Sequence, residues 1–299
     1  MFLYLEWQGR RPGKINILSD EPDVFNYRSE FKVNGTKHSI YGNINPTFED
    51  YYAPLKKYYK KSHYLSSHLQ KSIRRMDDMN AVQTAKHFID LDYISFIRRL
   101  PIIMLEDVTI HESFPVLIWL MIASTKGFPL KIPILKWLLG VVYYLSTCRE
   151  TTFYSNKEIN ELDILEMNNI FLYTLRLRKV YGGMKGDMNM IEYYTHLLFK
   201  NQITINRGKI NIVKHQMEKL PKKQWIIEAN DFHCNSYILD HIKGHFPKYS
   251  KDYIKKLIWI FSSSINMRVD PIEKTKKESD DWEKIEPYVK YYQRNCIFY

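Results

Sequence analysis

The first 45 residues alternate between two sets of side chains, as an extended chain does. Leu3, Leu5 and Trp7 fall on one face of a strand, because successive side chains of a strand point to opposite faces. Residues 9–13 are rich in Gly, Arg and Pro and predict a turn. Residues 14–18 then predict a second short strand, so the chain is expected to begin with β structure.

A further pair of strands is predicted around Asn34 and Gly35. These two residues separate the segments 31–33 and 36–41, and Asn-Gly supplies the positive φ angles of a tight hairpin turn. We therefore predict a small N-terminal sheet of about three or four strands, which covers one side of a helical body.

From residue 66 the apolar positions recur with the period of amphipathic helices. Several short helices with short links are expected, a pattern typical of a helical collar or solenoid. The predicted starts are Ser66 or Ser67 for a helix that ends near residue 76, Asp78 for residues 79–89, Asp92 for residues 93–100 and Pro101 for the helix that follows.

The most apolar region, residues 114–145, predicts two buried helices around a turn at residues 126–129. Neither half has the run of ~20 apolar residues that a membrane span needs, so no membrane span is expected. Residues 146–181 are expected to continue as helix.

The glycine-rich segment 182–186 predicts a boundary between lobes. After it, the alternating isoleucines of residues 202–213 predict a hairpin, and residues 253–261 a helix. The predicted fold is mainly α with a small β element. Residues 1–62 form the small sheet, residues 63–181 a helical core and residues 182–299 a mixed α/β region.

The net charge of +11, with a pI of about 9.2, gives the protein a positive potential. Nucleic acid, an anionic membrane surface or an acidic protein would each be attracted to it. Three widely spaced cysteines do not form a disulfide framework, so an intracellular location, cytoplasmic or nuclear, is expected. Frequent Lys, Ile, Asn and Tyr are typical of an AT-rich genome, such as that of a large DNA virus or an organelle.

Two basic segments are candidates for phosphate contacts. In the first, lysines alternate with tyrosines, a combination that suits base stacking with phosphate contacts, although tyrosines that pack in the core explain the pattern as well. The second is a basic helix. The candidate residues are Lys56, Lys57, Lys60, Lys61, Lys71, Arg74 and Arg75.

Glu106 and Asp107 lie among apolar residues, where an unpaired carboxylate is costly. We therefore expect them to form structural ion pairs, with Arg98 and Arg99 among the partners. The alternative is a Mg²⁺ site that these acids share with Asp90 or Asp92.

No phosphate-binding P-loop is present, because Gly13-Lys14 and Gly208-Lys209 are each followed by Ile-Asn rather than by Ser or Thr. A zinc site from His233 and Cys234 with His241 and His245 lacks paired ligand spacing. The segment from Asp231 to Cys234 is therefore interpreted as a structural turn, and no metal or cofactor is expected.

Residues 69–110 resemble the helical collar that follows the ATPase core in MgsA/RarA-type AAA+ proteins, which are relatives of clamp loaders. The matching features are Leu69-Gln70-Lys71-Ser72-Ile73-Arg74, the alanines at 81 and 85, Arg98-Arg99-Leu100 and Glu106-Asp107-Val108. The resemblance implies a helical unit for oligomerisation or for docking at DNA-replication assemblies. It does not imply ATP hydrolysis.

The sequence favours a protein without catalytic activity that associates with nucleic acid or acts as a replication accessory. One alternative is a scaffold subunit of a larger viral or organellar assembly, with a protein partner or a second copy. The other is a divalent-metal nuclease.

Overall fold

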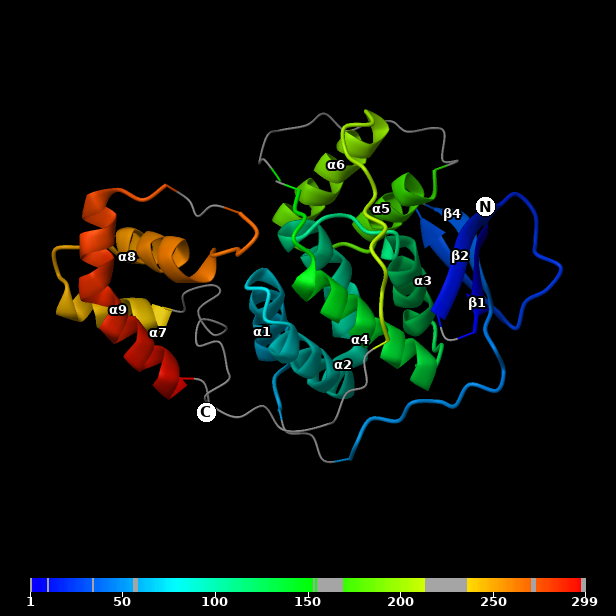
Figure 1. Cartoon of the computed structure of the whole chain (residues 1–299), viewed down its shortest axis with the longest axis horizontal. Helices are drawn as coiled ribbons and strands as arrows, with labels where there is room; N and C mark the ends of the chain where they lie inside the picture. The colour runs from blue at the N-terminus through cyan, green and yellow to red at the C-terminus, as the bar shows by residue number, and fades with distance from the viewer. Residues whose placement is uncertain are drawn as a thin grey trace.

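A computed structural model describes residues 2–9, 11–33, 35–55, 59–152, 154, 169–212, 236–269 and 273–296. The protein is mainly α with a small N-terminal sheet, as predicted. In Figure 1 the sheet lies at one end, the helices α1 to α6 form the middle, and α7 to α9 lie at the other end.

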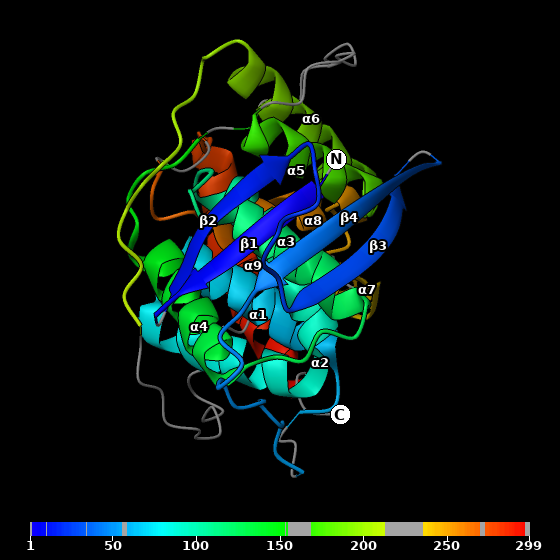
Figure 2. The same cartoon turned by 90° about the vertical axis from the view of Figure 1, so that its right-hand side faces the viewer.

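The sheet has four strands in the order β2-β1-β4-β3 (Figure 2). Strands β1 (Phe2–Gln8) and β2 (Arg11–Leu18) form one antiparallel pair, and β3 (Tyr27–Val33) and β4 (Thr36–Asn43) form the other. A parallel ladder between β1 and β4 joins the two pairs. The predicted hairpin at Gly35 is confirmed, and Gly35 has a φ of +82°.

Two helices begin the helical body. Helix α1 (Ser62–Arg74) starts before the predicted caps Ser66 and Ser67, so that prediction is wrong. Helix α2 (Asp78–Asp107) starts after Asp77, whose side chain, rather than that of Asp78, accepts from the backbone N–H of Asn80. A carboxylate at this position accepts a hydrogen bond from a backbone N–H that has no acceptor within the helix.

Helix α2 is interrupted at Asp92, which has non-helical φ and ψ angles of −157° and 81°. Its side chain accepts from the N–H of Ser95 at 3.0 Å, so a helical segment does start at Asp92, as predicted. The predicted start at Pro101 is wrong, because the same segment continues through Pro101 to Asp107. A proline is tolerated there at the cost of one backbone hydrogen bond.

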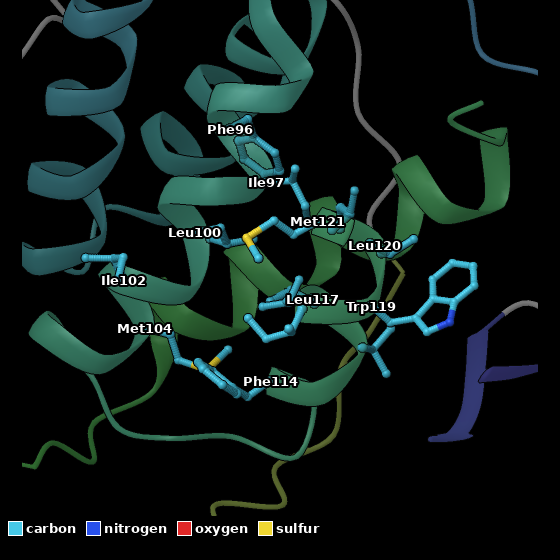
Figure 3. Close-up of a cluster of buried hydrophobic side chains, with 14 of the residues drawn as sticks. Phe96, Ile97, Leu100, Ile102, Met104, Phe114, Leu117, Trp119, Leu120 and Met121 are labelled. Carbon is cyan, nitrogen blue, oxygen red and sulfur yellow. The ribbon is translucent and has the colours of Figure 1, made fainter. Parts of the chain in front are cut away.

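Helices α3 (Phe114–Thr125) and α4 (Ile132–Thr147) confirm the predicted apolar pair. Every residue of α3 from Phe114 to Ala123 is buried, which explains why this helix has no polar face. Figure 3 shows its side chains interleaved with Phe96, Leu100 and Met104 of α2. Helix α3 is therefore the centre of the core.

Helices α5 (Ile170–Val180) and α6 (Lys185–Phe199) complete this core. Leu177 and Ile191, on opposite sides of the predicted boundary at 182–186, belong to the same hydrophobic cluster as the sheet. The residues of a second hydrophobic cluster begin only at Ile238, later in the chain than the predicted boundary at 182–186.

A second hydrophobic cluster joins α7 (Ser236–His245), α8 (Lys251–Ile258) and α9 (Lys276–Cys296). A π-helical turn, η3 (Trp259–Ser263), continues α8, so the helix predicted at 253–261 is present. The hairpin predicted at 202–213 is wrong for residues 202–212. There a single bridge joins Asn206 to His111.

Candidate functional site

The basic residues of helix α1 do not form the exposed surface that the predicted phosphate contacts require. Lys71 and Arg74 are only 1% and 4% exposed, so both side chains are buried in the fold. Arg75 is half-buried, and its Nη2 donates to the carbonyl of Ser262 at 3.0 Å, so it too serves the fold. Lys60 and Lys61 are exposed, whereas Lys56 and Lys57 lie outside the described residues.

Arg74 instead belongs to a buried set of ion pairs. Its Nε lies 2.5 Å from Oδ1 of Asp107, and its Nη2 lies 3.3 Å from Oε1 of Glu106. Arg99 pairs with Glu106 at 3.4 Å and with Asp187 of α6 at 3.2 Å. The pairs therefore tie α1, α2 and α6 together, and the two acids have a structural role.

Two members of this region differ from expectation. Arg98 donates to the backbone carbonyl of Tyr181 at 3.1 Å rather than to a carboxylate. Burial, reinforced by the neighbouring Asp107, raises the pKa of Glu106 to about 7, so a proton is held there more tightly than on an exposed glutamate.

The acids proposed for a nuclease do not converge. Asp90 pairs with Lys86 at 2.6 Å, and Asp92 caps its own helical segment. Within the part of the chain that the structure describes, no three His, Cys, Asp or Glu side chains lie close enough together to hold a metal ion. The proposed zinc ligands His233 and Cys234, with Asp231, lie outside the described residues.

Arg268 fastens the second hydrophobic cluster to the core. Its guanidinium donates to the carbonyls of Ile73, at 2.8 Å, and Cys148, at 2.7 Å, and to that of Leu145. These carbonyls lie at the C-terminal ends of α1 and α4, where the helices leave acceptors open. One side chain therefore caps two helices.

A cleft of about 760 Å³ opens on another side of the core. It is bounded by the start of β2, the N-terminal ends of α3 and α5, and the segment 205–210 that follows α6. In Figure 2 this yellow-green segment runs down the side of the molecule where β2 lies. The lining residues are Gln8, Arg11, Pro12, Gly13, Lys14, Ile15, Glu112, Ser113, Pro115, Val116, Trp137, Ile170, Phe171, Ile205, Arg207, Lys209 and Ile210.

Four cationic side chains, Arg11, Lys14, Arg207 and Lys209, line this cleft, against the single carboxylate of Glu112. All four are exposed, and none of them forms an ion pair or side-chain hydrogen bond with another described residue. By contrast, Arg74 and Lys86 inside the core are neutralised by carboxylates. The cleft thus gathers positive charge that forms no ion pair within the described part of the chain.

The backbone adds to this positive potential. The N-terminal residues Pro115 and Val116 of α3, and Ile170 and Phe171 of α5, line the same cleft. The N-terminal end of a helix carries partial positive charge, which favours anions. Four side-chain charges and two helix ends therefore act in the same direction.

Asn206 holds one wall of the cleft in place. Its Oδ1 accepts from the hydroxyl of Tyr144 and from the N–H of Gly208, and its Nδ2 donates to Glu150 at 2.6 Å. Its backbone N–H donates to the carbonyl of Ile110 at 3.0 Å. The neighbouring Arg207 and Lys209 are therefore carried on an anchored segment.

His111 supports the same wall. Burial lowers its pKa, and Nε2 lies 2.8 Å from the carbonyl of Gly208, which can only accept. The imidazole therefore carries its proton on Nε2, and Nδ1 accepts from the N–H of Ser113 at 3.1 Å. This neutral histidine joins the start of α3 to the segment 205–210.

The sequence contained a signal for this cleft. Gly13-Lys14-Ile15-Asn16 and Gly208-Lys209-Ile210-Asn211 are the same tetrapeptide, each preceded within two residues by an arginine. Each fails as a P-loop by itself, but the structure brings the two copies to one cleft.

Comparisons with known proteins add no relative: no family model, no curated protein and no solved structure matches this chain. Among the described helices, none combines the length and apolar character needed to cross a membrane.

Proposed function

We propose that this protein binds nucleic acid, without catalysing its turnover, and that the cleft holds the phosphates. The observation that carries the proposal is the convergence of Arg11, Lys14, Arg207 and Lys209, unpaired among the described residues, on one concave surface. Lys and Arg contacts to phosphate dominate the affinity of such proteins. The net charge of +11 would steer a polyanion toward the molecule.

The resemblance of residues 69–110 to a helical collar extends this proposal. It favours an accessory role for the protein at DNA-replication assemblies. These residues form α1 and α2 in the structure, and their charged side chains fasten helices. In this proposal the helical unit supplies the framework, and the cleft supplies the contact with nucleic acid.

Binding measured over a salt series tests the proposal. The cleft variant R11S/K14S/R207S/K209S removes four charges from exposed positions. The control K126S/K255S/K276S/K277S also removes four exposed charges, one at the far end of α3 and three in the α7–α9 cluster. Each phosphate contact contributes about −0.7 to −0.9 to the slope of log affinity against log salt concentration.

The slope of the cleft variant should become shallower by about 2–4, with a large loss of affinity, whereas the control should keep most of both. Absence of low-salt binding by the unmodified protein would sink the proposal. Equal losses of affinity in the two variants would show that binding depends on the overall charge of the protein and not on the cleft.

A second candidate function is that of a subunit in a larger assembly. It is favoured by an aromatic groove of about 400 Å³ on α7 and α9, lined by His245, Pro287, Tyr288, Tyr291 and Tyr292. Tyr291 is 62% exposed, and tyrosines are enriched at protein interfaces. The variant Y288A/Y291A should then disrupt a complex seen by size-exclusion chromatography while leaving nucleic-acid affinity unchanged.

A further inference from the structure

We infer that the ligand of the cationic cleft is an unpaired single strand, and that the cleft takes two consecutive nucleotides. This inference rests on the proposed function and specifies its ligand. Three features of the cleft carry it: its concave shape, its apolar wall residues, and the duplicated Gly-Lys-Ile-Asn segment.

The shape favours a thin chain. A duplex carries its phosphates on a convex surface, on either side of grooves about 12 and 6 Å wide. The charges here line a recess of about 760 Å³, comparable with small-ligand sites of about 300–1,000 Å³. A single strand can enter such a recess, as it does in proteins whose basic grooves track one backbone.

The walls contain groups that a duplex would leave unused. Pro12, Phe171, Ile205 and Ile210 line the cleft and are half-buried, so a ligand can reach them. In a duplex the base faces are stacked inside and only the edges are offered in the grooves. An unpaired nucleotide offers a base face to an apolar wall and a phosphate to a cation.

The duplication sets the number of nucleotides. Each Gly-Lys-Ile-Asn copy contributes one lysine to the cleft, Lys14 or Lys209. Each lysine has a half-buried apolar neighbour in the lining, which is Pro12 for the first copy and Ile210 for the second. An arginine, Arg11 or Arg207, precedes each copy. The cleft therefore contains two sets of cationic and apolar groups, which corresponds to two repeats of a phosphate and a base.

Gly13 and Gly208 allow the two repeated segments to lie close against neighbouring residues. A Cβ on Gly13 would lie 2.8 Å from the backbone oxygen of Glu6, and a Cβ on Gly208 would lie 2.1 Å from the hydroxyl oxygen of Tyr144. Both positions therefore require glycine for the segments to lie where they do. The repeated tetrapeptide thus has a structural reason for its Gly as well as a ligand reason for its Lys.

The test compares thymidine oligonucleotides of one to eight nucleotides with a duplex of eight base pairs, by fluorescence anisotropy at one salt concentration. Inorganic pyrophosphate serves as a competitor that has charge but no base. The cleft variant R11S/K14S/R207S/K209S reports whether binding occurs at this site. The double variant I205N/I210N tests the apolar wall, and circular dichroism checks that it is folded.

Affinity should rise by at least tenfold from one nucleotide to two and only gradually thereafter. The single strand should bind at least tenfold tighter than the duplex, and I205N/I210N should remove most of that preference. If the wall variant does not fold, the length series and the pyrophosphate competition still decide the question.

Two results would overturn the inference while leaving the proposed function in place. One is equal binding of single strand and duplex, both lost in the cleft variant. The other is full competition by pyrophosphate at the concentration at which a dinucleotide competes. The site would then recognise negative charge and make no use of a base. If neither nucleic acid binds at low salt, the proposed function fails and the inference fails with it.

Discussion

The indole ring of Trp119 lies directly against the backbone of Gly42. A Cβ atom on Gly42 would lie 2.7 Å from Cζ2 of Trp119, which is closer than real side chains approach. The indole Nε1 also donates to the carbonyl of Tyr41 at 2.8 Å. The sheet is therefore fastened to the central helix α3 through one side chain that needs a glycine opposite it.

Gly42→Ala should lower the free energy of unfolding by about 1–3 kcal/mol, since an extra methyl group in a filled core forces its neighbours to move. Urea denaturation monitored by tryptophan fluorescence measures the loss. Gly186→Ala in α6 is the matched control, because a Cβ there meets nothing within 4 Å. An equal loss in both variants would mean that the contact with Trp119 is not the cause.

Arg268→Ala should destabilise the attachment of the α7–α9 cluster. The change leaves carbonyls at the ends of α1 and α4 without their donor, and hydrogen bonds from a charged group contribute about 1.5–3 kcal/mol each. We expect a loss of about 2–4 kcal/mol in chemical denaturation, with earlier proteolysis around α8.

The control for Arg268 is Arg207→Ala. This change removes an equally charged side chain that bonds no other described residue, and it should leave stability within about 0.5 kcal/mol. A stability loss of the same size in both variants would contradict the capping role.

The stability of the protein should depend on the protonation of Glu106. Its pKa in the fold is about 7, above its ordinary value of 4.5, because burial disfavours the charge. The folded state therefore binds the proton more tightly than the unfolded state, so this group's contribution is fully present below about pH 4.5 and is lost as the pH rises to about 7.

Glu106→Gln imitates the protonated form, so its stability relative to the unmodified protein should increase by about 1–3 kcal/mol between pH 5 and pH 8. Denaturation at both pH values measures this difference. If the difference falls with pH instead, the attraction of Arg74 and Arg99 for the charged form outweighs its burial.

Asn206→Ala should weaken nucleic-acid binding without changing the charge of the cleft. The substitution removes the acceptor for Tyr144 and Gly208 and the donor to Glu150, so Arg207 and Lys209 would lose their fixed positions. We expect about a 3–10-fold loss of affinity, equivalent to about 1 kcal/mol, with an almost unchanged salt slope. Asn211→Ala, an exposed position in the same segment, should bind normally.

The sequence predicted best where a short-range signal decides the structure. The Asn-Gly pair in the sequence predicted the β3–β4 hairpin that the structure contains, and Asp92 starts a helical segment through a bond to a residue three positions away. Pro101 misled because proline at a first helical turn and proline inside a helix look alike locally. Tertiary packing of α2 decided between them.

The charged residues of α1 misled for a related reason. Lys71 and Arg74 follow the pattern of a basic surface helix, but α2 and residues 262–268 cover that face. The cleft was equally hidden, because Lys14 and Lys209 lie far apart in the sequence and line one cleft only in the folded chain. A search for repeated tetrapeptides could have suggested their pairing, but only the fold shows that they share one cavity.

The parallel ladder between β1 and β4 has a consequence for the order of folding. Each hairpin of the sheet can form from neighbouring residues, but the β1–β4 ladder joins segments separated by the other two strands, and non-local pairing is slow. The two hairpins are expected to remain separate until α3, which is made later and contacts strands of both, offers a common support. The sheet at the start of the chain would then be among the last parts to be completed.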